Sequence, residues 1–159
     1  MDSSTTIQRD VKIEADPATV FAFLTDPQRL MRWMGVSATL EPRPGGLYLV
    51  DVNSGHIAQG EFKEVLPVSR LAYSFGWQGN DTVPPGSSLI EIDLEPQNGG
   101  TMVHFSHSGL PAHTVPAHAE GWTHYLGRLV MAARGHDPGP DPWHNPPNAA
   151  PLDFTARRS

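Results

Sequence analysis

The fold is decided by the stretch GTMVHFSHSGLPAHTVPAHAEGWTHYLGRLVMAARG, residues 100–135. Its first part alternates apolar and polar side chains, which predicts a strand, and the Gly-Leu-Pro turn that follows ends this strand. After the turn the spacing changes to that of a helix, with Trp122, Leu126 and Leu129 on the apolar side. Gly135 is a natural C-terminal stop for this helix. The stretch therefore predicts a last strand that is joined by a short turn to a long final helix.

The residues ahead of this stretch are typical of strands and turns. Residues 88–96, SLIEIDLEP, alternate between apolar and acidic side chains, which is typical of an antiparallel strand with one buried and one solvated face. In the strand predicted over residues 55–67 we interpret Gly60 as a β-bulge. Residues 70–77, RLAYSFGW, place four large apolar side chains on one face: Leu71, Tyr73, Phe75 and Trp77.

The first part of the chain predicts one strand and two short helices. Residues 7–15 alternate as a strand does. Asp16-Pro17 and Asp26-Pro27 each combine an N-cap Asp with Pro at the first helical position. The second of these helices is expected to hold Trp33 and to stop near Gly35.

The order of one strand, two short helices, about six antiparallel strands and one long helix predicts an α+β fold. A strongly curved sheet needs an apolar element in its concavity, and only the final helix is long enough. We therefore expect a helix-grip fold, in which a curved antiparallel sheet wraps around a long C-terminal helix and two short helices follow the first strand. Such an arrangement often leaves a cavity between helix and sheet, and cavities of this kind are usual ligand sites.

Length and composition limit the possible functions. The 159 residues fit one domain, expected over residues 1–143, with a Pro-rich irregular tail over 144–159. Lys and Arg number 11 against 17 Asp and Glu, a net charge of −6, so we expect no nucleic-acid partner. The absence of cysteine excludes disulfides and thiol catalysis. The sequence has no secretory signal pattern and no apolar run that could span a membrane, so we expect a cytoplasmic protein.

Five of the eight histidines lie close together in the sequence, between residues 104 and 124. His104 and His107 point to opposite faces of a strand, and His118 and His124 do not share a face of a helix. Because zinc needs several converging ligands, we expect no metal site, and no cofactor is expected either. His107 has the parity of the buried face, and His118 precedes Trp122 by one helical turn, so both are expected to face the cavity. His124 is expected to be solvated.

The candidate ligand-binding residues are large or polar side chains that we expect on the inner side of the sheet and helix. They are Trp33, Tyr48, Tyr73, Phe75, Trp77, Phe105, His107, His118 and Trp122. Among them, His107, His118 and Tyr73 are also the candidates for proton transfer. We prefer a hydrogen-bonding pocket wall to acid–base catalysis, because a catalytic base must reach a defined proton. The sequence thus favours binding of a small hydrophobic molecule, with a cyclase-, aromatase- or hydrolase-like enzyme as the alternative.

Several stretches resemble one known family. GEFKEVLPVSRLAYSFGW (60–77) resembles the central hairpin of the activator of heat-shock-protein-90 ATPase homologue-like family, a branch of the START-like, birch-pollen-allergen-like (SRPBCC) superfamily. The resemblance covers about residues 7–143. Other stretches similar to that family are DPATVFAFLTDPQRLMRWMG (16–35), PGGLYLV (44–50), GTMVHFSHSGLP (100–111), EGWTHYLGRL (120–129) and GHDPGPDPW (135–143).

The resemblance implies the helix-grip fold and a hydrophobic pocket. Relatives in the wider superfamily carry lipids or hormones or act as polyketide cyclases, and the eukaryotic namesake activates a chaperone. That namesake has a further N-terminal domain, which we do not expect in this chain, so a co-chaperone role is the weaker alternative. A sheet edge in this fold could support a homodimer.

Overall fold

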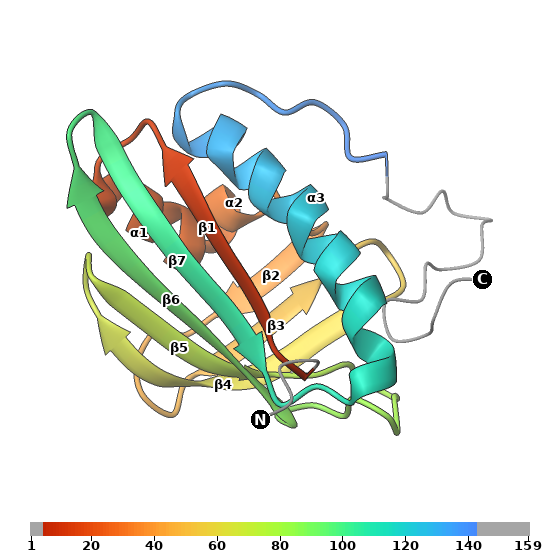
Figure 1. Ribbon diagram of the computed structural model, residues 1–159. Helices are drawn as coiled ribbons and strands as arrows, with labels where there is room; N and C mark the ends of the chain where they lie inside the picture. Colours follow the sequence, from red (N-terminus) through yellow and green to blue (C-terminus); the bar gives the residue numbers. More distant parts are fainter. Residues whose placement is uncertain (1–4, 143–159) are drawn as a thin grey trace.

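The computed structural model describes residues 5–142 and contains one curved antiparallel sheet with a long helix across its inner side (Figure 1). The strands are β1 (Ile7–Ile13), β2 (Ser37–Leu40), β3 (Leu47–Asp51), β4 (Ile57–Leu66), β5 (Arg70–Phe75), β6 (Ser88–Gln97) and β7 (Gly100–Ser108). The helices are α1 (Pro17–Thr25), α2 (Pro27–Leu30) and α3 (Val115–Ala133), and a short 3₁₀ turn, η2 (Ala112–Thr114), precedes α3. This order confirms the predicted α+β, helix-grip fold.

The sheet has the strand order β1-β7-β6-β5-β4-β3-β2, with every neighbouring pair antiparallel. Its two edges, β1 and β2, are consecutive strands in the sequence, and α1 and α2 form the connection between them. β1 lies beside β7, with Ile7 opposite His107. α3 crosses the concave side and closes the core against the inner faces of the strands (Figure 1).

Both short helices begin as the Asp-Pro pairs predict. The Asp16 carboxylate accepts a hydrogen bond from the Thr19 N–H at 2.8 Å, and Asp26 accepts from the Gln28 N–H at 3.0 Å. The second helix is shorter than predicted, because α2 ends at Leu30. Trp33 therefore lies in the turn after α2, where its indole N–H donates to the Phe23 carbonyl at 3.0 Å.

The interpretation of Gly60 as a β-bulge is wrong. The register between β4 and β5 shifts further along, between Phe62 and Glu64. Gly60 instead lies where the backbone of β5 comes very close, since a Cβ atom there would be 1.7 Å from the Ser74 carbonyl oxygen. The residue is glycine because the neighbouring backbone leaves no space for a side chain.

The outer face of the sheet carries the acidic side chains predicted there, joined by one arginine. Arg70 donates to Glu64 at 2.7 Å, to Glu91 at 2.6 Å and to Asp93 at 2.8 Å. These three carboxylates raise the pKa of Arg70 above its ordinary value. The strand alternation in β6 is confirmed, with its apolar side chains buried and its acidic side chains turned outward.

After α3 the chain turns at Gly135, which has a φ of +91°, and residues 135–142 return along the helix (Figure 1). We call these residues the C-terminal strap. Arg128 of α3 binds the strap by donating to the Gly139 carbonyl at 3.0 Å. The predicted tail over residues 144–159 lies outside the described residues. In the described part of the chain, no helix is long and apolar enough to cross a membrane.

Candidate functional site

A pocket of about 320 Å³, a volume that includes its opening to solvent, lies between α3 and the sheet. We call it the inner pocket. The enclosed space inside it is much smaller, about 20 Å³, which is enough for about one water molecule. It is lined by Met34, Val52, Phe75, Trp77, His118, Gly121, Trp122 and Tyr125. Apart from the His118 ring and the Tyr125 hydroxyl, this lining is apolar.

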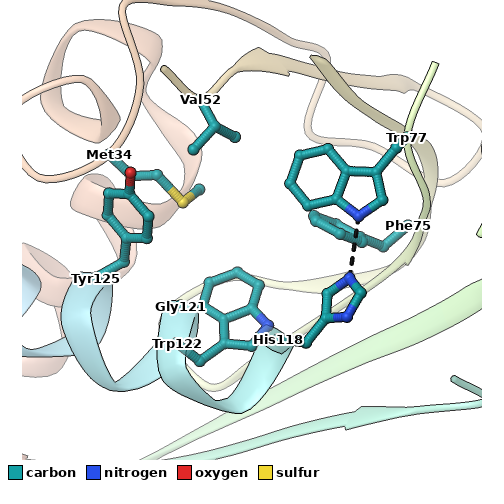
Figure 2. A pocket seen from close by; sticks show the side chains of 8 residues that line it. All are labelled: Met34, Val52, Phe75, Trp77, His118, Gly121, Trp122 and Tyr125. Carbon is teal, nitrogen blue, oxygen red and sulfur yellow. Dashed lines mark hydrogen bonds between the residues drawn. The ribbon is translucent and has the colours of Figure 1, made fainter. Parts of the chain in front are cut away.

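The lining comes from three parts of the fold, as Figure 2 shows. Met34 and Val52 lie on one side, Trp77 and Phe75 lie across the open space from them, and α3 supplies the remaining wall. The side chains of Met34, Val52 and Trp77 are no more than 5% exposed. The inner pocket is therefore narrow and enclosed by residues that belong to the core.

His118 is held in the pocket wall by two protein partners. Its Nδ1 lies 2.8 Å from the Thr114 carbonyl oxygen, which can only accept, so Nδ1 carries the hydrogen. Its Nε2 is then the acceptor, and it receives the Trp77 indole N–H at 3.0 Å (Figure 2). This bond joins α3 to the chain just after β5.

His107 forms a second pair of this kind, with the roles of helix and sheet exchanged. Its Nδ1 accepts the Trp122 indole N–H at 3.0 Å, so Nε2 carries the hydrogen and donates to the Ser88 hydroxyl at 2.8 Å. Ser88 in turn donates to the Phe75 carbonyl at 2.8 Å. A chain of three hydrogen bonds thus runs from α3 through β7 and β6 to β5.

The two histidines are neutral components of the core in this arrangement. Their ring centroids are 5.6 Å apart, and each ring uses both nitrogens for protein partners. Burial, together with the neighbouring His118, lowers the pKa of His107 well below its ordinary value. Neither ring can exchange a proton with a bound molecule unless one of these hydrogen bonds first breaks.

The nine predicted ligand-binding residues are mostly divided between the inner pocket and the core, and one lies elsewhere. Four of them line the inner pocket: Phe75, Trp77, His118 and Trp122. Trp33 lines a neighbouring hollow. The other four are buried in the core away from the pocket: Tyr48, Tyr73, Phe105 and His107.

Tyr73, a predicted candidate for proton transfer, is one of the four core residues. Its ring stacks on that of Tyr48, with centroids 4.2 Å apart. Burial is the main cause that raises the pKa of Tyr73 well above its ordinary value, and Tyr48 adds to it. The hydroxyl of Tyr73 therefore stays protonated, and the residue packs in the core.

Four lining residues were not predicted: Met34, Val52, Gly121 and Tyr125. Tyr125 is the one polar side chain among them, but its hydroxyl oxygen is buried and adds no polar surface to the pocket. Burial, and then the neighbouring Asp141 carboxylate, raise the pKa of Tyr125 well above its ordinary value. Its helical spacing from Trp122 signalled that it is buried, but not that open space lies beside it.

The remaining histidines within residues 5–142 do not gather into one site. His104 is on the outer face, between Asp10 at 2.8 Å and Glu95 at 3.0 Å. The expectation that His124 is solvated is wrong, because its side chain is only 18% exposed and its Nε2 lies 2.8 Å from Asp141. Over residues 5–142, no three His, Asp or Glu side chains converge in a way that could hold a metal ion.

Comparison with known proteins gives one family. The profile described as Activator of Hsp90 ATPase homolog 1-like protein matches residues 14–133. The solution structure of an AHSA1-like protein from Rhizobium etli is 53% identical, covers 93% of both chains and has a TM-score of 0.70. No curated protein matches the chain.

Two less similar structures share the fold. DynU16, described as a protein in the dynemicin biosynthetic locus, is 24% identical, with a TM-score of 0.73 over 84% of this chain and 49% of its own. The Aha1 dimer from Colwellia psychrerythraea is 20% identical, with a TM-score of 0.71 over 82% of this chain and 96% of its own. At these identities the likeness extends to the fold alone.

Proposed function

The chain belongs to the Activator of Hsp90 ATPase homolog 1-like family, and we propose that it binds a small, mostly apolar molecule in the inner pocket. The observation that carries the proposal is the pocket itself, a narrow space walled by Phe75, Trp77 and Trp122. Aromatic walls favour a flat, ring-containing ligand, because ring faces and edges pack well at van der Waals distance.

The size of the pocket limits the ligand. Because the enclosed space is only about 20 Å³, even a molecule with one or two rings requires the lining to move, and a long lipid chain is disfavoured. Met34 is the most adaptable side chain of the lining, since a methionine has three rotatable bonds and a polarisable sulfur. Movement of Met34 is the simplest way for the pocket to adjust to a guest.

A catalytic function is the second candidate, because a histidine and a tyrosine, His118 and Tyr125, line one pocket. Binding is favoured over catalysis, since both ring nitrogens of His118 are engaged by Trp77 and Thr114. A general base must reach the proton that it removes. Turnover that survives in His118→Gln would count against a proton relay through this residue.

Native mass spectrometry of the purified protein tests the proposal first, by searching for a small molecule that copurifies. A titration with naphthalene, followed by NMR shifts of the pocket residues, tests it with a defined probe. We expect saturable shifts of the Trp77 and Trp122 indole N–H signals.

A pair of matched variants on α3 provides the control. Gly121 lines the pocket, whereas Gly127 on the same helix is exposed, and a side chain added there would extend into open space. Gly121→Leu is expected to fill the pocket and abolish naphthalene binding, and Gly127→Leu is expected to leave it unchanged. Equal binding by both variants, with α3 intact by circular dichroism, would contradict the inner pocket as the ligand site.

A further inference from the structure

Two further hollows lie between the inner pocket and the surface. A hollow of about 210 Å³ shares Met34 and Val52 with the inner pocket, so these two side chains form the boundary between them. That hollow in turn shares Arg128 and Asp141 with a surface groove of about 710 Å³. The three spaces thus adjoin one another in order, from the surface groove beside Arg128 and Asp141 to the aromatic walls of the inner pocket.

The C-terminal strap forms the outer side of this series. Asp141 of the strap lies 2.8 Å from His124 Nε2 on α3, and its carboxylate also acts on the hydroxyl of Tyr125. The Gly139 carbonyl accepts from Arg128 at 3.0 Å. The strap is thus fixed to α3 by side chains near the outer opening of these spaces, and one of them, Tyr125, also lines the inner pocket.

Arg128 and Asp141 carry opposite charges where the hollow meets the surface groove, and the groove itself also holds Arg32 and Asp137. Arg128 is tied to the opposite wall as well, because its Nε donates to the Trp33 carbonyl at 3.0 Å. Asp141 is 12% exposed at its side chain, so its carboxylate is mostly removed from solvent. We call the space between Arg128 and Asp141 the portal.

We infer that the ligand enters the inner pocket beneath the C-terminal strap, and that Arg128 and Asp141 at the portal bind the polar end of an uncharged alcohol or phenol. This inference rests on the proposed function and adds the entry route and the chemical class of the ligand. The aromatic body occupies the inner pocket, and the hydroxyl points outward to the portal.

The charges at the portal favour a hydroxyl group over a carboxylate or an ammonium group. A hydroxyl can accept a hydrogen bond from a guanidinium and donate one to a carboxylate. A carboxylate or an ammonium group is attracted by one of these two charges and repelled by the other, so little net attraction offsets the loss of its hydration. Because the portal is largely shielded from water, these differences are greater than they would be at an open surface.

Three probes with one aromatic body test the selectivity: 2-naphthol, 2-naphthoate and 2-naphthylmethylamine in its ammonium form. For the wild-type protein we expect 2-naphthol to bind about tenfold more tightly than either ion, the size of one buried hydrogen bond. Asp141→Asn is expected to reduce the preference of 2-naphthol over 2-naphthoate. Asp81→Asn makes the same change of charge in an exposed loop and is expected to leave the preference unchanged.

The possible outcomes separate the two proposals. If none of the three probes binds, the proposed function fails together with the inference. If all three bind equally, or if Asp141→Asn leaves their ratio unchanged, the inference fails while the proposed function stands.

The entry route has a test that needs no ligand. Hydrogen exchange of the Trp77 and Trp122 indole N–H groups, followed by NMR, reports the access of water to the inner pocket. Asp141→Ala removes the attachment of the strap to His124, and we expect both indoles to exchange severalfold faster. Backbone amides of β6, such as that of Ile92, should exchange at the wild-type rate and so show that the sheet is intact. Unchanged indole exchange would overturn the route beneath the strap.

Discussion

Trp122 donates its indole N–H to His107 at 3.0 Å, and this buried bond fixes α3 to β7. One helical turn earlier, His118 accepts the corresponding bond from Trp77. In each pair a tryptophan indole N–H donates to a neutral histidine ring. In one pair the tryptophan is on α3, and in the other pair the histidine is on α3. These bonds fix both the position and the rotation of α3, and with them the shape of the inner pocket.

Replacing Trp122 with Phe tests the contribution of this bond. The variant keeps an aromatic ring but leaves Nδ1 of His107 without its donor in a buried site. We expect a loss of about 1–3 kcal/mol in the free energy of unfolding, measured by urea denaturation. Leu126→Met, a volume-conserving change on the same helix, should cost less than about 1.5 kcal/mol. A loss under about 0.5 kcal/mol for Trp122→Phe would show that the bond contributes little.

The stability of the protein is expected to fall in mild acid because of His107. The pKa of His107 is held well below its ordinary value in the folded protein, whereas in the unfolded chain it is about 6.5. Below that pH the unfolded state takes up a proton that the folded state does not, so unfolding becomes easier by up to about 1.4 kcal/mol per pH unit. Above about pH 6.5 the contribution of His107 is fully present.

Urea denaturation between about pH 4.5 and 8 measures this slope, and His107→Asn should reduce it. His104→Gln is the control, since Glu95 and Asp10 raise the pKa of His104. Its contribution therefore has the opposite sign, present at low pH and lost as the pH rises through the raised pKa. Identical slopes for wild type and His107→Asn would rule out His107 as the cause.

Gly60→Ala is expected to destabilise the protein severely. The new methyl group would lie 1.7 Å from the Ser74 carbonyl oxygen, so β4 and β5 must separate, at a cost of about 3 kcal/mol or more. Gly127→Ala makes the same chemical change at an open site on α3 and should stabilise the helix by about 1 kcal/mol. Thermal unfolding that ranks the two variants in the reverse order would contradict the close approach of the strands.

Val68→Gly is expected to stabilise the hairpin between β4 and β5. Val68 has a φ of +73°, which is strained for a β-branched residue, at a cost of about 1–2 kcal/mol. It lies in a turn that the Ser69 N–H closes by donating to the Leu66 carbonyl at 3.0 Å. Glycine removes the strain but loses more chain entropy, so a net gain of about 0.5–1 kcal/mol should appear in chemical denaturation. Val65→Gly, inside β4, should instead destabilise.

Arg70→Gln is expected to expose the repulsion among Glu64, Glu91 and Asp93 on the outer face of the sheet. Since Arg70 is partly buried among the three carboxylates, we expect a loss of about 1–2 kcal/mol. The loss should shrink in about 1 M NaCl, because salt screens the remaining negative charges. A loss that is independent of salt would instead indicate a packing effect of the arginine side chain.

The alternation of side chains predicted much of the fold and part of the site. It separated His104 on the outer face from His107 on the inner face, because a strand has a period of two. It also predicted that Trp77 and Trp122 point inward, and both line the inner pocket. The alternation of side chains alone could not show which inward side chains have open space beside them, because the position of a pocket depends on how the side chains of different elements pack together.

The parts that sequence reasoning missed come from irregular segments. Met34 and Val52 lie in turns outside the helices and strands, and the strap that brings Asp141 to His124 has no periodicity. Their positions follow from tertiary contacts, such as the bond between Arg128 and Gly139, which local patterns do not encode.

The pairing of β1 with β7 also has a consequence for how the chain folds as it is synthesised. Ile7 lies opposite His107, 100 residues later, so the first strand leaves the ribosome long before its partner exists. α3 follows β7, and until it emerges the apolar concave side of the sheet has nothing to cover it. Such non-local pairing slows folding and leaves hydrophobic surface exposed during synthesis. The nascent chain is therefore most vulnerable to aggregation in the interval between completion of β6 and release of the final helix.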